Sequence, residues 1–220
     1  IVSDTASNIV ARIGNYGANV DNLDASDTNV SISVSQGNTL NTSNTTFVAG
    51  DNVTVVDSQG NINGANFTTL KNNVGVDNID VSGTDSITVS VTQALAGINF
   101  VDSTVTVSDS QSNIEVANFT NLASAGVTNV DSTNDTLTLN ATQASSNIDF
   151  TAADVVTVSD TASNIVARIG SYGANVDNLD ASDTNVSITV SQANTLNTAS
   201  TTFVAGDNVT ITDTQANING

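Results

Sequence analysis

The chain has 220 residues, and its 22 acidic groups against 3 basic ones give a formal net charge of −19. It contains no Cys, His, Met, Trp or Pro, which excludes thiol nucleophiles, imidazole bases, disulfides and metal sites built from thiolate or imidazole ligands. The three cations, Arg12, Lys71 and Arg168, cannot form a basic patch, so we expect no nucleic acid as a partner. We also expect no enzymatic activity, and the chemistry that remains is that of oxygen ligands.

The apolar content nevertheless predicts a folded chain. Apolar residues make up 38% of the sequence, largely in period-2 runs, whereas aromatic residues make up only 4%. A thin core of small aliphatic side chains favours stacked coils over a large globule. No apolar stretch approaches the ~20 residues that span a bilayer, so we expect no transmembrane segment. No signal peptide is visible, and we expect any export signal to lie outside this window.

Internal repeats organise the whole chain. Residues 1–64 match residues 157–220 at 54 of 64 positions. The motif D-x-x-x-N-I recurs at spacings of 53, 52, 51 and 53 residues, and it begins at Asp4, Asp57, Asp109, Asp160 and Asp213. The repeat is therefore about 52 residues long, as in arrays of stacked supersecondary units. We expect a window cut from a longer array, with units at 1–51 (its start truncated), 52–103, 104–154 and 155–207, and the start of a fifth at 208–220.

Each unit reads as the same series of elements. A first short strand alternates apolar and hydroxyl residues at 53–57, 105–109, 156–160 and 209–213. The D-x-x-x-N-I motif follows, with its Asp as a candidate helix N-cap, and then a variable segment such as 10–19 that suits a short helical turn or an irregular arc. A second short strand is expected within 20–26, 76–82, 127–133 and 176–182.

After a polar turn comes the longest predicted strand, at 30–36, 86–93, 136–143 and 186–192. Its alternation points Ile87, Val89 and Val91 inward in one unit, and Leu137 and Leu139 in the next. One Phe per unit closes the series as a predicted core anchor: Phe47, Phe100, Phe150 and Phe203.

This pattern predicts an all-β fold, a β-solenoid built from ~52-residue units with short helical turns or loops in each unit. Separate immunoglobulin-like domains are the alternative, but those need about 100 residues and roughly seven strands. A single 52-residue unit could scarcely bury a core of its own, and stacking on its neighbours would solve that problem.

The Asp residues are the strongest candidates for chemistry, because 20 of the 21 fall into five columns of the repeat. Stacked units would bring like charges together, and a hard cation such as Ca²⁺ would neutralise them. The expected calcium ligands flank the polar turn between two strands: Asp24, Asp27, Asp80, Asp85, Asp131, Asp135, Asp180 and Asp183. The competing interpretation is that each Asp only forms a turn or caps a helix.

Two further columns consist of Asn, for which we expect structural ladders in which each side-chain amide bonds the next. The members of the first are Asn8, Asn61, Asn113, Asn164 and Asn217, and those of the second are Asn22, Asn78, Asn129 and Asn178.

The run V-T-V-S-D-T-x-x-N-I, followed by V-D-N-[IL]-D-x-S and T-L-T-L-x-A-T-Q, resembles the β-strand repeats of very large secreted bacterial surface proteins. These include giant adhesin-like and cell-surface proteins of proteobacteria and marine cyanobacteria. The resemblance covers essentially the whole chain and implies an extracellular, non-catalytic structural part of a filament, a surface layer or an adhesin stalk. The partner would then be the same repeat array, through self-association or continuation. The alternative is a repeat-based binding module that engages calcium, cell-surface glycans or ice.

Overall fold

A computed structural model describes residues 1–16 and 19–219. It is a mixed α/β structure, 31% helical and 30% strand, with several short parallel sheets. The prediction of an all-β solenoid is therefore wrong. Half of the secondary structure is helical because Ser, Thr and Asn, which we interpreted as turn and strand residues, cap a series of short helices.

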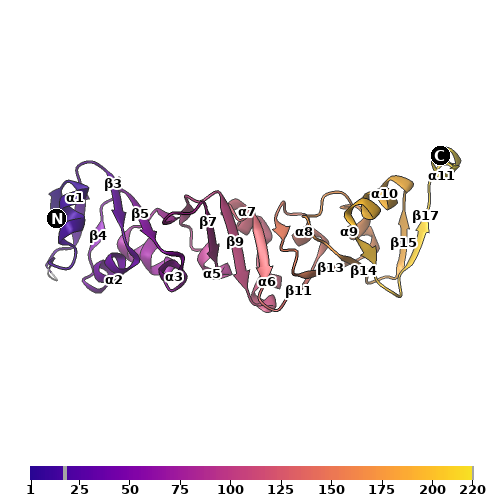
Figure 1. The fold of residues 1–220 in the computed structure, drawn as a ribbon, viewed down its shortest axis with the longest axis horizontal. Helices are drawn as coiled ribbons and strands as arrows, with labels where there is room; N and C mark the ends of the chain where they lie inside the picture. Colours follow the sequence, from indigo (N-terminus) through magenta and orange to yellow (C-terminus); the bar gives the residue numbers. More distant parts are fainter. Residues whose placement is uncertain (17–18, 220) are drawn as a thin grey trace. The chain divides into compact units, whose positions relative to one another are not determined.

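The chain forms two compact units, Ile1–Val107 and Ser108–Gly220, each of which is described by itself. The described elements that begin in the first unit are, in chain order (Figure 1), β1 (Val2–Asp4), α1 (Ala6–Arg12), β2 (Asn22–Ala25), β3 (Asn29–Ile32), α2 (Val34–Thr42), β4 (Thr46–Phe47), β5 (Asn52–Asp57), α3 (Gln59–Asn63), α4 (Phe67–Thr69), the π-helix η1 (Leu70–Val74), β6 (Asn78–Val81), β7 (Ser86–Val89), α5 (Val91–Ala94), β8 (Asn99–Phe100) and β9 (Thr104–Asp109). Residues 17 and 18 of the predicted arc at 10–19 lie outside the described residues.

The second unit repeats this series (Figure 1) with α6 (Gln111–Glu115), α7 (Phe119–Ser124), β10 (Asn129–Ser132), β11 (Thr136–Leu139), α8 (Ala141–Ala144), β12 (Asp149–Phe150), β13 (Val155–Asp160), α9 (Ala162–Val166), β14 (Asn178–Ala181), β15 (Asn185–Ile188), α10 (Val190–Ala199), β16 (Thr202–Phe203), β17 (Asn208–Ile211) and α11 (Gln215–Asn219). No helix among residues 1–16 and 19–219 is long and apolar enough to cross a membrane.

All the strand pairs within the described part of each unit are parallel, and some of them, such as β3 with β5, join successive repeats. In the first unit β3 pairs with β5, β5 with β6, and β6 with β8, while β2 lies between β1 and β4. The second unit repeats the four-stranded arrangement as β11, β13, β14 and β16. Parallel neighbours need a crossover connection, and the short helices supply it. The third strand of the first repeat, β3, thus pairs with β5, the first strand of the next repeat, and β11 pairs with β13 in the same way.

The inward residues of the predicted long strand are confirmed up to its midpoint. Ile87 and Val89 are 1% and 2% exposed, and Leu137 and Leu139 are also buried. Val91 is different, because the strand ends at Val89 and Val91 begins α5. The same change from strand to helix occurs in each of the four repeats, so the prediction is wrong for the second half of each long strand.

Aromatic rings mark the core of each unit. Of the predicted Phe anchors, Phe47 and Phe150 are buried, whereas Phe100 is only partly so. Two Phe residues from the variable segments lie beside them: Phe67 packs on Phe100 with ring centroids 6.4 Å apart, and Phe119 packs on Phe150 at 6.5 Å. Both pairs are tilted, and their centroid separations lie within the range typical of aromatic pairs.

Candidate functional site

The helix that follows each long strand is held at its N-terminus by a capping box. In α5, the Ser90 hydroxyl accepts the N–H of Gln93 at 3.2 Å, and Gln93 Oε1 accepts the N–H of Ser90 at 2.9 Å. The same pair of bonds recurs at the start of the three equivalent helices, α2, α8 and α10. A strand cannot continue through such a box, because its backbone N–H groups are already turned into the first helical turn.

The amide nitrogen of the same glutamine reaches back to the preceding helix. Gln93 Nε2 donates to the carbonyl oxygens of Ile62 at 3.0 Å, Ala65 at 3.1 Å and Asn63 at 3.3 Å, at the C-terminal end of α3. We call the four equivalent residues the Gln braces: Gln36, Gln93, Gln143 and Gln192. Each brace thus adds hydrogen bonds to backbone groups at two helix ends, where the first N–H groups and the last carbonyls lack i→i−4 partners.

The other braces make fewer of these contacts. Gln143 Nε2 donates to the carbonyls of Glu115 at 2.8 Å and Ala117 at 3.3 Å. Gln36 and Gln192 each donate to one carbonyl, that of Val10 at 3.2 Å and that of Val166 at 2.9 Å. The contact is thus reproduced in all four repeats, and the number of accepting carbonyls differs between them.

The Asp of the D-x-x-x-N-I motif performs a similar task. Asp57 Oδ1 accepts the N–H of Ser58 at 2.8 Å and the side-chain amide of Asn61 at 2.7 Å, so it supports the start of α3. Its other oxygen, Oδ2, accepts the N–H of Val34, the first residue of α2, at 3.0 Å. The N-cap itself is the next residue, Ser58. The prediction that the motif Asp is the N-cap is therefore wrong by one position.

Two other copies of this Asp make the same set of bonds. Asp160 Oδ2 accepts from Ala141 at the start of α8, and Asp213 Oδ2 accepts from Val190 at the start of α10, each at 3.1 Å. We call Asp57, Asp160 and Asp213 the Asp braces. The hydrogen bond from Asn61 holds the pKa of Asp57 below its ordinary value, and Asn164 does the same for Asp160.

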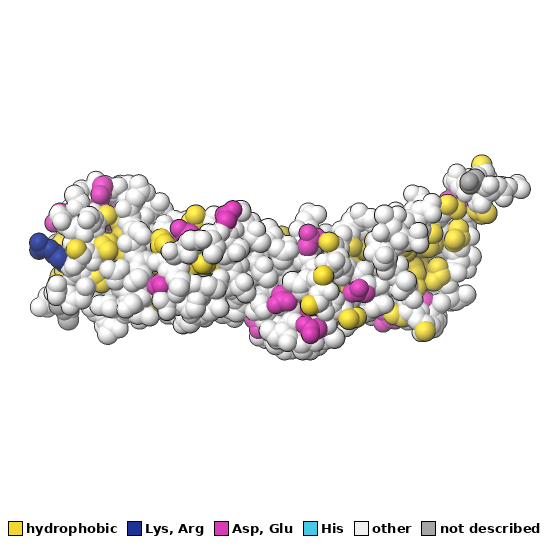
Figure 2. Space-filling model, viewed as in Figure 1, with side chains coloured by type: hydrophobic (Ala, Val, Ile, Leu, Met, Phe, Trp, Pro, Cys, Tyr) yellow, Lys and Arg dark blue, Asp and Glu magenta, His cyan; other side chains and the backbone are white. Residues whose placement is uncertain are grey.

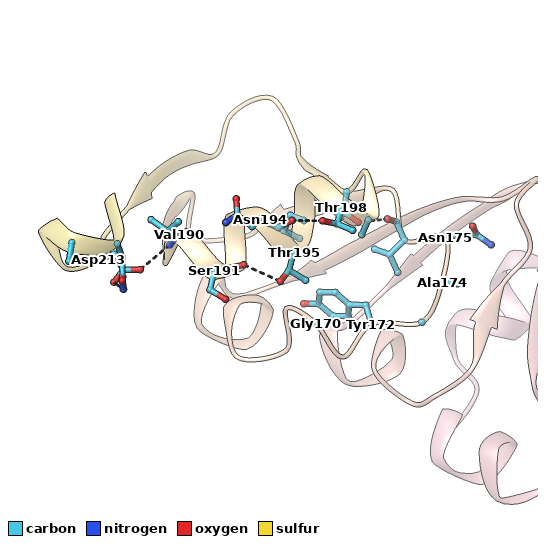
Figure 3. Close-up of a pocket in the computed structure, with 17 residues that line it drawn as sticks. Gly170, Tyr172, Ala174, Asn175, Val190, Ser191, Asn194, Thr195, Thr198 and Asp213 are labelled. Carbon is cyan, nitrogen blue, oxygen red and sulfur yellow. Dashed lines mark hydrogen bonds between the residues drawn. The ribbon is translucent and has the colours of Figure 1, made fainter. Parts of the chain in front are cut away.

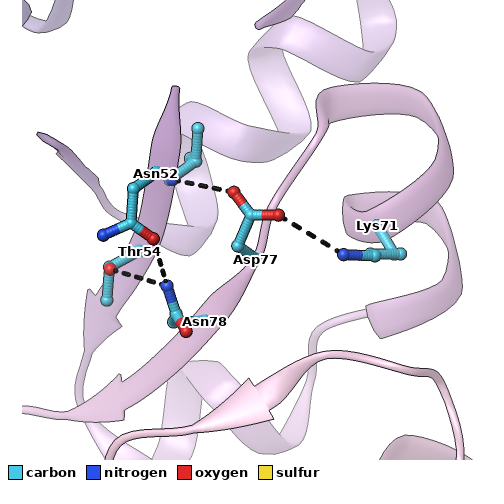
Figure 4. Close-up of polar contacts among 6 residues, drawn as sticks. Asn52, Thr54, Lys71, Asp77 and Asn78 are labelled. Atoms are coloured by element: carbon cyan, nitrogen blue, oxygen red, sulfur yellow. Dashed lines mark hydrogen bonds and ion pairs between the residues drawn. The ribbon is translucent and has the colours of Figure 1, made fainter. Parts of the chain in front are cut away.

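The first Asn column therefore serves the motif Asp, and the ladder predicted for it is wrong. A short ladder does form elsewhere in the first unit, where Asn78 Nδ2 donates to Asn52 Oδ1 at 2.8 Å (Figure 4). Asn52 Nδ2 in turn donates to Asn29 Oδ1 at 3.1 Å. Beside this ladder, Asp77 accepts the N–H of Val53 at 3.1 Å and faces Lys71 at 3.4 Å.

The predicted calcium ligands fall into two structural classes. The first members of each pair are the third residues of equivalent strands: Asp24, Asp80, Asp131 and Asp180. The second members lie in the turn before the next strand: Asp27, Asp85, Asp135 and Asp183.

Several of these carboxylates already accept hydrogen bonds from groups of the protein. Asp27 and Asp183 each accept, at 2.6 Å, the N–H of the first residue of a helix, α1 and α9 respectively. Asp85 accepts both the N–H and the hydroxyl of Ser103, at 3.2 and 2.7 Å.

The strand members bond hydroxyl groups in the second unit. Asp131 accepts the hydroxyls of Ser108 at 2.8 Å and Thr151 at 2.9 Å, and Asp180 accepts that of Ser159 at 3.0 Å. These contacts resemble those of turn-forming and capping Asp residues. Within residues 1–16 and 19–219, no three acidic side chains group in a way that could hold a metal ion, and calcium binding stays a prediction.

A fifth Asp column, not among the predicted ligands, places more deeply buried carboxylates next to these pairs. Asp154 is 4% exposed; its oxygens accept the N–H of Ser132 at 3.2 Å and the Thr151 hydroxyl at 2.8 Å. Burial raises the pKa of Asp154, and the negative charges of Asp131 and Asp135 raise it further.

The first unit has the same arrangement around Asp51, whose oxygens accept the N–H of Ala25 at 3.2 and 3.3 Å. Burial raises the pKa of Asp51, and the charges of Asp24, Asp27 and Asp77 add to the rise. The structure thus brings two of the predicted ligand pairs near a third carboxylate, from a column that the sequence analysis counted but did not include among the ligands.

Asp102, the member of this column in the following repeat, has fewer hydrogen-bond partners. Asp102 is 6% exposed, and its Oδ2 accepts the N–H of Val81 at 3.0 Å. Its Oδ1 is buried and has no hydrogen-bond partner within the described residues. Val101 follows Phe100 here, whereas Thr151 follows Phe150 and provides a hydroxyl. Valine has no donor to offer, which accounts for the difference.

No known family of proteins matches this chain, and no curated protein or solved structure is significantly similar to it.

Proposed function

We propose that the chain is a non-catalytic structural segment of a repetitive extracellular bacterial protein, which builds a filament, a surface layer or an adhesin stalk. The observation that carries this proposal is the Gln brace, which joins two helices in each of the four repeats. A binding module concentrates its distinctive side chains at one place, whereas this chain repeats the same internal contact. Stability gained from contacts between neighbours suits a protein that must be long.

The charge and composition support the same role. A net charge of −19 keeps an array soluble and discourages lateral clumping. The absence of Cys from the sequence is compatible with an exported array, because such an array draws its stability from interfaces between repeats.

Immunogold electron microscopy on the organism that encodes the chain tests this proposal. An antiserum raised against residues 1–220 should label intact cells, with the gold following filaments, a surface layer or stalks. Preimmune serum and permeabilised cells serve as controls. Labelling that appears only after permeabilisation would show that the protein is not at the cell surface, and the proposal would fail.

Calcium binding is the second candidate function, and the raised pKa values of Asp51 and Asp154 favour it. Both groups lie among further carboxylates, so a divalent cation would lower the electrostatic cost of keeping all of them ionised. The ligands would be the predicted pairs, such as Asp131 with Asp135.

Thermal melting in chelator, in calcium and in sodium chloride of matched ionic strength measures this effect. We expect a rise of the melting temperature with calcium that sodium does not reproduce, and a smaller rise in a double variant with Asp131→Asn and Asp135→Asn. Equal melting in the three solutions would leave these residues as turn formers.

A further inference from the structure

Two carboxylates in the repeat at 52–103 have fewer hydrogen-bond donors than their equivalents. Asp213 shows the usual arrangement in this chain, since its carboxylate accepts the N–H of Val190 at 3.1 Å (Figure 3). Asp102 is 6% exposed, and its buried Oδ1 accepts no hydrogen bond within the described residues. Asp80 of β6 is partly exposed, and no group of the described residues donates to its carboxylate. A buried oxygen of an ionised group is costly without a partner, so this pair points to a partner from outside the chain.

The equivalent pair in the second unit is held by hydroxyl groups. Asp131 accepts the Ser108 hydroxyl at 2.8 Å and the Thr151 hydroxyl at 2.9 Å. The Thr151 hydroxyl also lies 2.8 Å from Oδ2 of Asp154, and Asp154 accepts the N–H of Ser132, the residue that follows Asp131. One hydroxyl oxygen therefore contacts both carboxylates of this pair.

Valine stands at both hydroxyl positions in the repeat at 52–103. Val56 is the residue of β5 that corresponds to Ser108, and it lies opposite Asp80 in the parallel pair of β5 and β6. Val101 takes the position of Thr151, directly after the core Phe. Valine has no polar hydrogen to donate. This repeat thus keeps both acids but lacks both hydroxyl donors.

Backbone pairing brings the two acids together. Strand β8 pairs with β6, with Phe100 opposite Ile79, so the chain after β8 runs beside the end of β6. Asp102 Oδ2 accepts the N–H of Val81, the residue that follows Asp80, at 3.0 Å. This bond fixes the carboxylate of Asp102 at the amide next to Asp80, as the equivalent bond does in the second unit.

We propose that Asp80 and Asp102 bind one calcium ion, at the place that the Thr151 hydroxyl takes in the second unit. One divalent cation neutralises two carboxylates, and Ca²⁺ accepts an irregular shell completed by backbone carbonyls and water, whereas Mg²⁺ demands near-ideal octahedral geometry. Asp85 borders the site, because it accepts the N–H and the hydroxyl of Ser103, the residue after Asp102.

The site deepens the calcium candidate and rests on it, but its ligand pair differs from the predicted ones. Asp102 is not among the predicted ligands, and the proposal singles out one repeat because of its two valines. Figure 2 shows acidic side chains exposed on both units, and the net charge of −19 raises the concentration of cations near the surface.

Calcium titration of the purified, isotope-labelled chain, followed by two-dimensional NMR spectroscopy at physiological ionic strength, tests the proposal. The chain is first freed of metal with a chelator. We expect the amide signals of Val81 and Ser103 to shift along one saturating curve, because these amides bond to Asp102 and Asp85. Asp102→Asn should weaken binding at least tenfold, and it should fold because asparagine still offers an oxygen to the Val81 N–H. Asp154→Asn is the matched control and should leave this curve unchanged.

Exchanging the hydroxyl positions between repeats tests the reason for the site. A chain with Val56→Ser and Val101→Thr keeps every acid but gains the two donors, so calcium should bind at least tenfold more weakly. Both positions tolerate the change, because Val56 is partly exposed and Val101 is 56% exposed. The converse chain, with Ser108→Val and Thr151→Val, should gain a second saturating shift at the amide of Ser132.

Three results would overturn the proposal: no saturating shift at Val81 in the wild type, equal affinity in Asp102→Asn, or equal affinity in the chain with the two added hydroxyls. The broader calcium candidate is judged separately, by thermal melting. If calcium raised the melting temperature of Asp102→Asn as much as that of the wild type, the candidate would stand and this site would not. Cell-surface labelling is independent of both measurements.

Discussion

Replacing Gln93 with alanine is the most direct test of the Gln braces. The side chain is 9% exposed and connects two helix ends at once: its Oε1 accepts the N–H of Ser90, and its Nε2 serves the last carbonyls of α3. Alanine keeps the helix propensity of the position but removes both functions. The Ile62 carbonyl still accepts the N–H of Ala65, at 3.0 Å. The groups that lose their hydrogen-bond partner in the variant are therefore the Ala65 carbonyl and the Ser90 N–H.

The magnitude follows from these two groups. Loss of a capping interaction costs about 0.5–2 kcal/mol. A buried carbonyl left without a partner costs about 1–3 kcal/mol. Water reaches this partly open site and recovers part of the loss, so we expect Gln93→Ala to lower the free energy of unfolding by about 2–4 kcal/mol. The shift in melting temperature should be roughly 2–4 °C per kcal/mol for a chain of this length.

Urea unfolding followed by circular dichroism provides the measurement. Thr92→Ala, an exposed change on the same helix, is the matched control and should cost less than about 0.5 kcal/mol. The equivalent changes should form a series, with Gln93→Ala the most costly, Gln143→Ala intermediate and Gln36→Ala the least, in the order of their carbonyl contacts. If Gln93→Ala were no more damaging than Thr92→Ala, the brace would contribute nothing to stability and our reasoning would be wrong.

Three further predictions concern the core, the titration of the carboxylates and the array. Ile87→Asp places a charge at a buried position and should cost several kcal/mol, about 3 or more, whereas Thr88→Asp on the other side of the strand should be mild; equal thermal melts would refute the assignment of faces. The pKa of Asp57 is lowered in the folded state, so its contribution to stability is present above the unfolded pKa and is lost as pH falls. Asp57→Asn should therefore lower the free energy of unfolding at neutral pH and change it little at pH ~3. The pKa of Asp154 is raised in the folded state, so its contribution to stability is lost as pH rises. The free energy of unfolding of Asp154→Asn, relative to that of wild type, should therefore be most favourable at neutral pH. Urea titrations in which both variants showed the same pH dependence would contradict these two predictions. An isolated repeat of residues 52–103 should be largely unfolded by circular dichroism, because its first strand loses its β3 partner; a cooperative melt as high as that of the whole chain would instead indicate independent domains.

The strands were predictable because their side chains alternate between core and solvent. The apolar positions of β5 and β7, such as Val55 and Ile87, are buried as expected, and the first and second strands of each repeat lie within or next to the predicted ranges. Alternation reports which face of a strand is buried, and that property depends on sequence neighbours alone.

The helices were missed because their signals are polar. The pattern S-x-x-Q at Ser90 to Gln93 is a capping box, and it ends the strand that alternation alone would extend to residue 93. The apolar spacing around α5 is too short to show a helical period over four residues. A search for capping boxes at the ends of predicted strands would have found four of the helices.

The candidate site was predictable only in part, because its main contacts join residues 19 to 31 positions apart. The Asp columns pointed to the correct residues, but the sequence does not show which backbone N–H lies opposite each carboxylate, as Val34 does for Asp57. The Gln column gave no chemical signal by itself, since its significance depends on the end of a helix in the preceding motif.

The Gln braces have a consequence for how such a sequence can diversify. Each brace contacts backbone carbonyls, which every amino acid possesses, so only the glutamine needs to be kept. The receiving residues differ accordingly, with Val10, Ile62, Glu115 and Val166 in the four repeats. Recombination between repeats can therefore lengthen, shorten or reshuffle the gene while each Gln brace still finds backbone carbonyls to bind. The 54 identical positions shared by 1–64 and 157–220 fit a duplication of that kind.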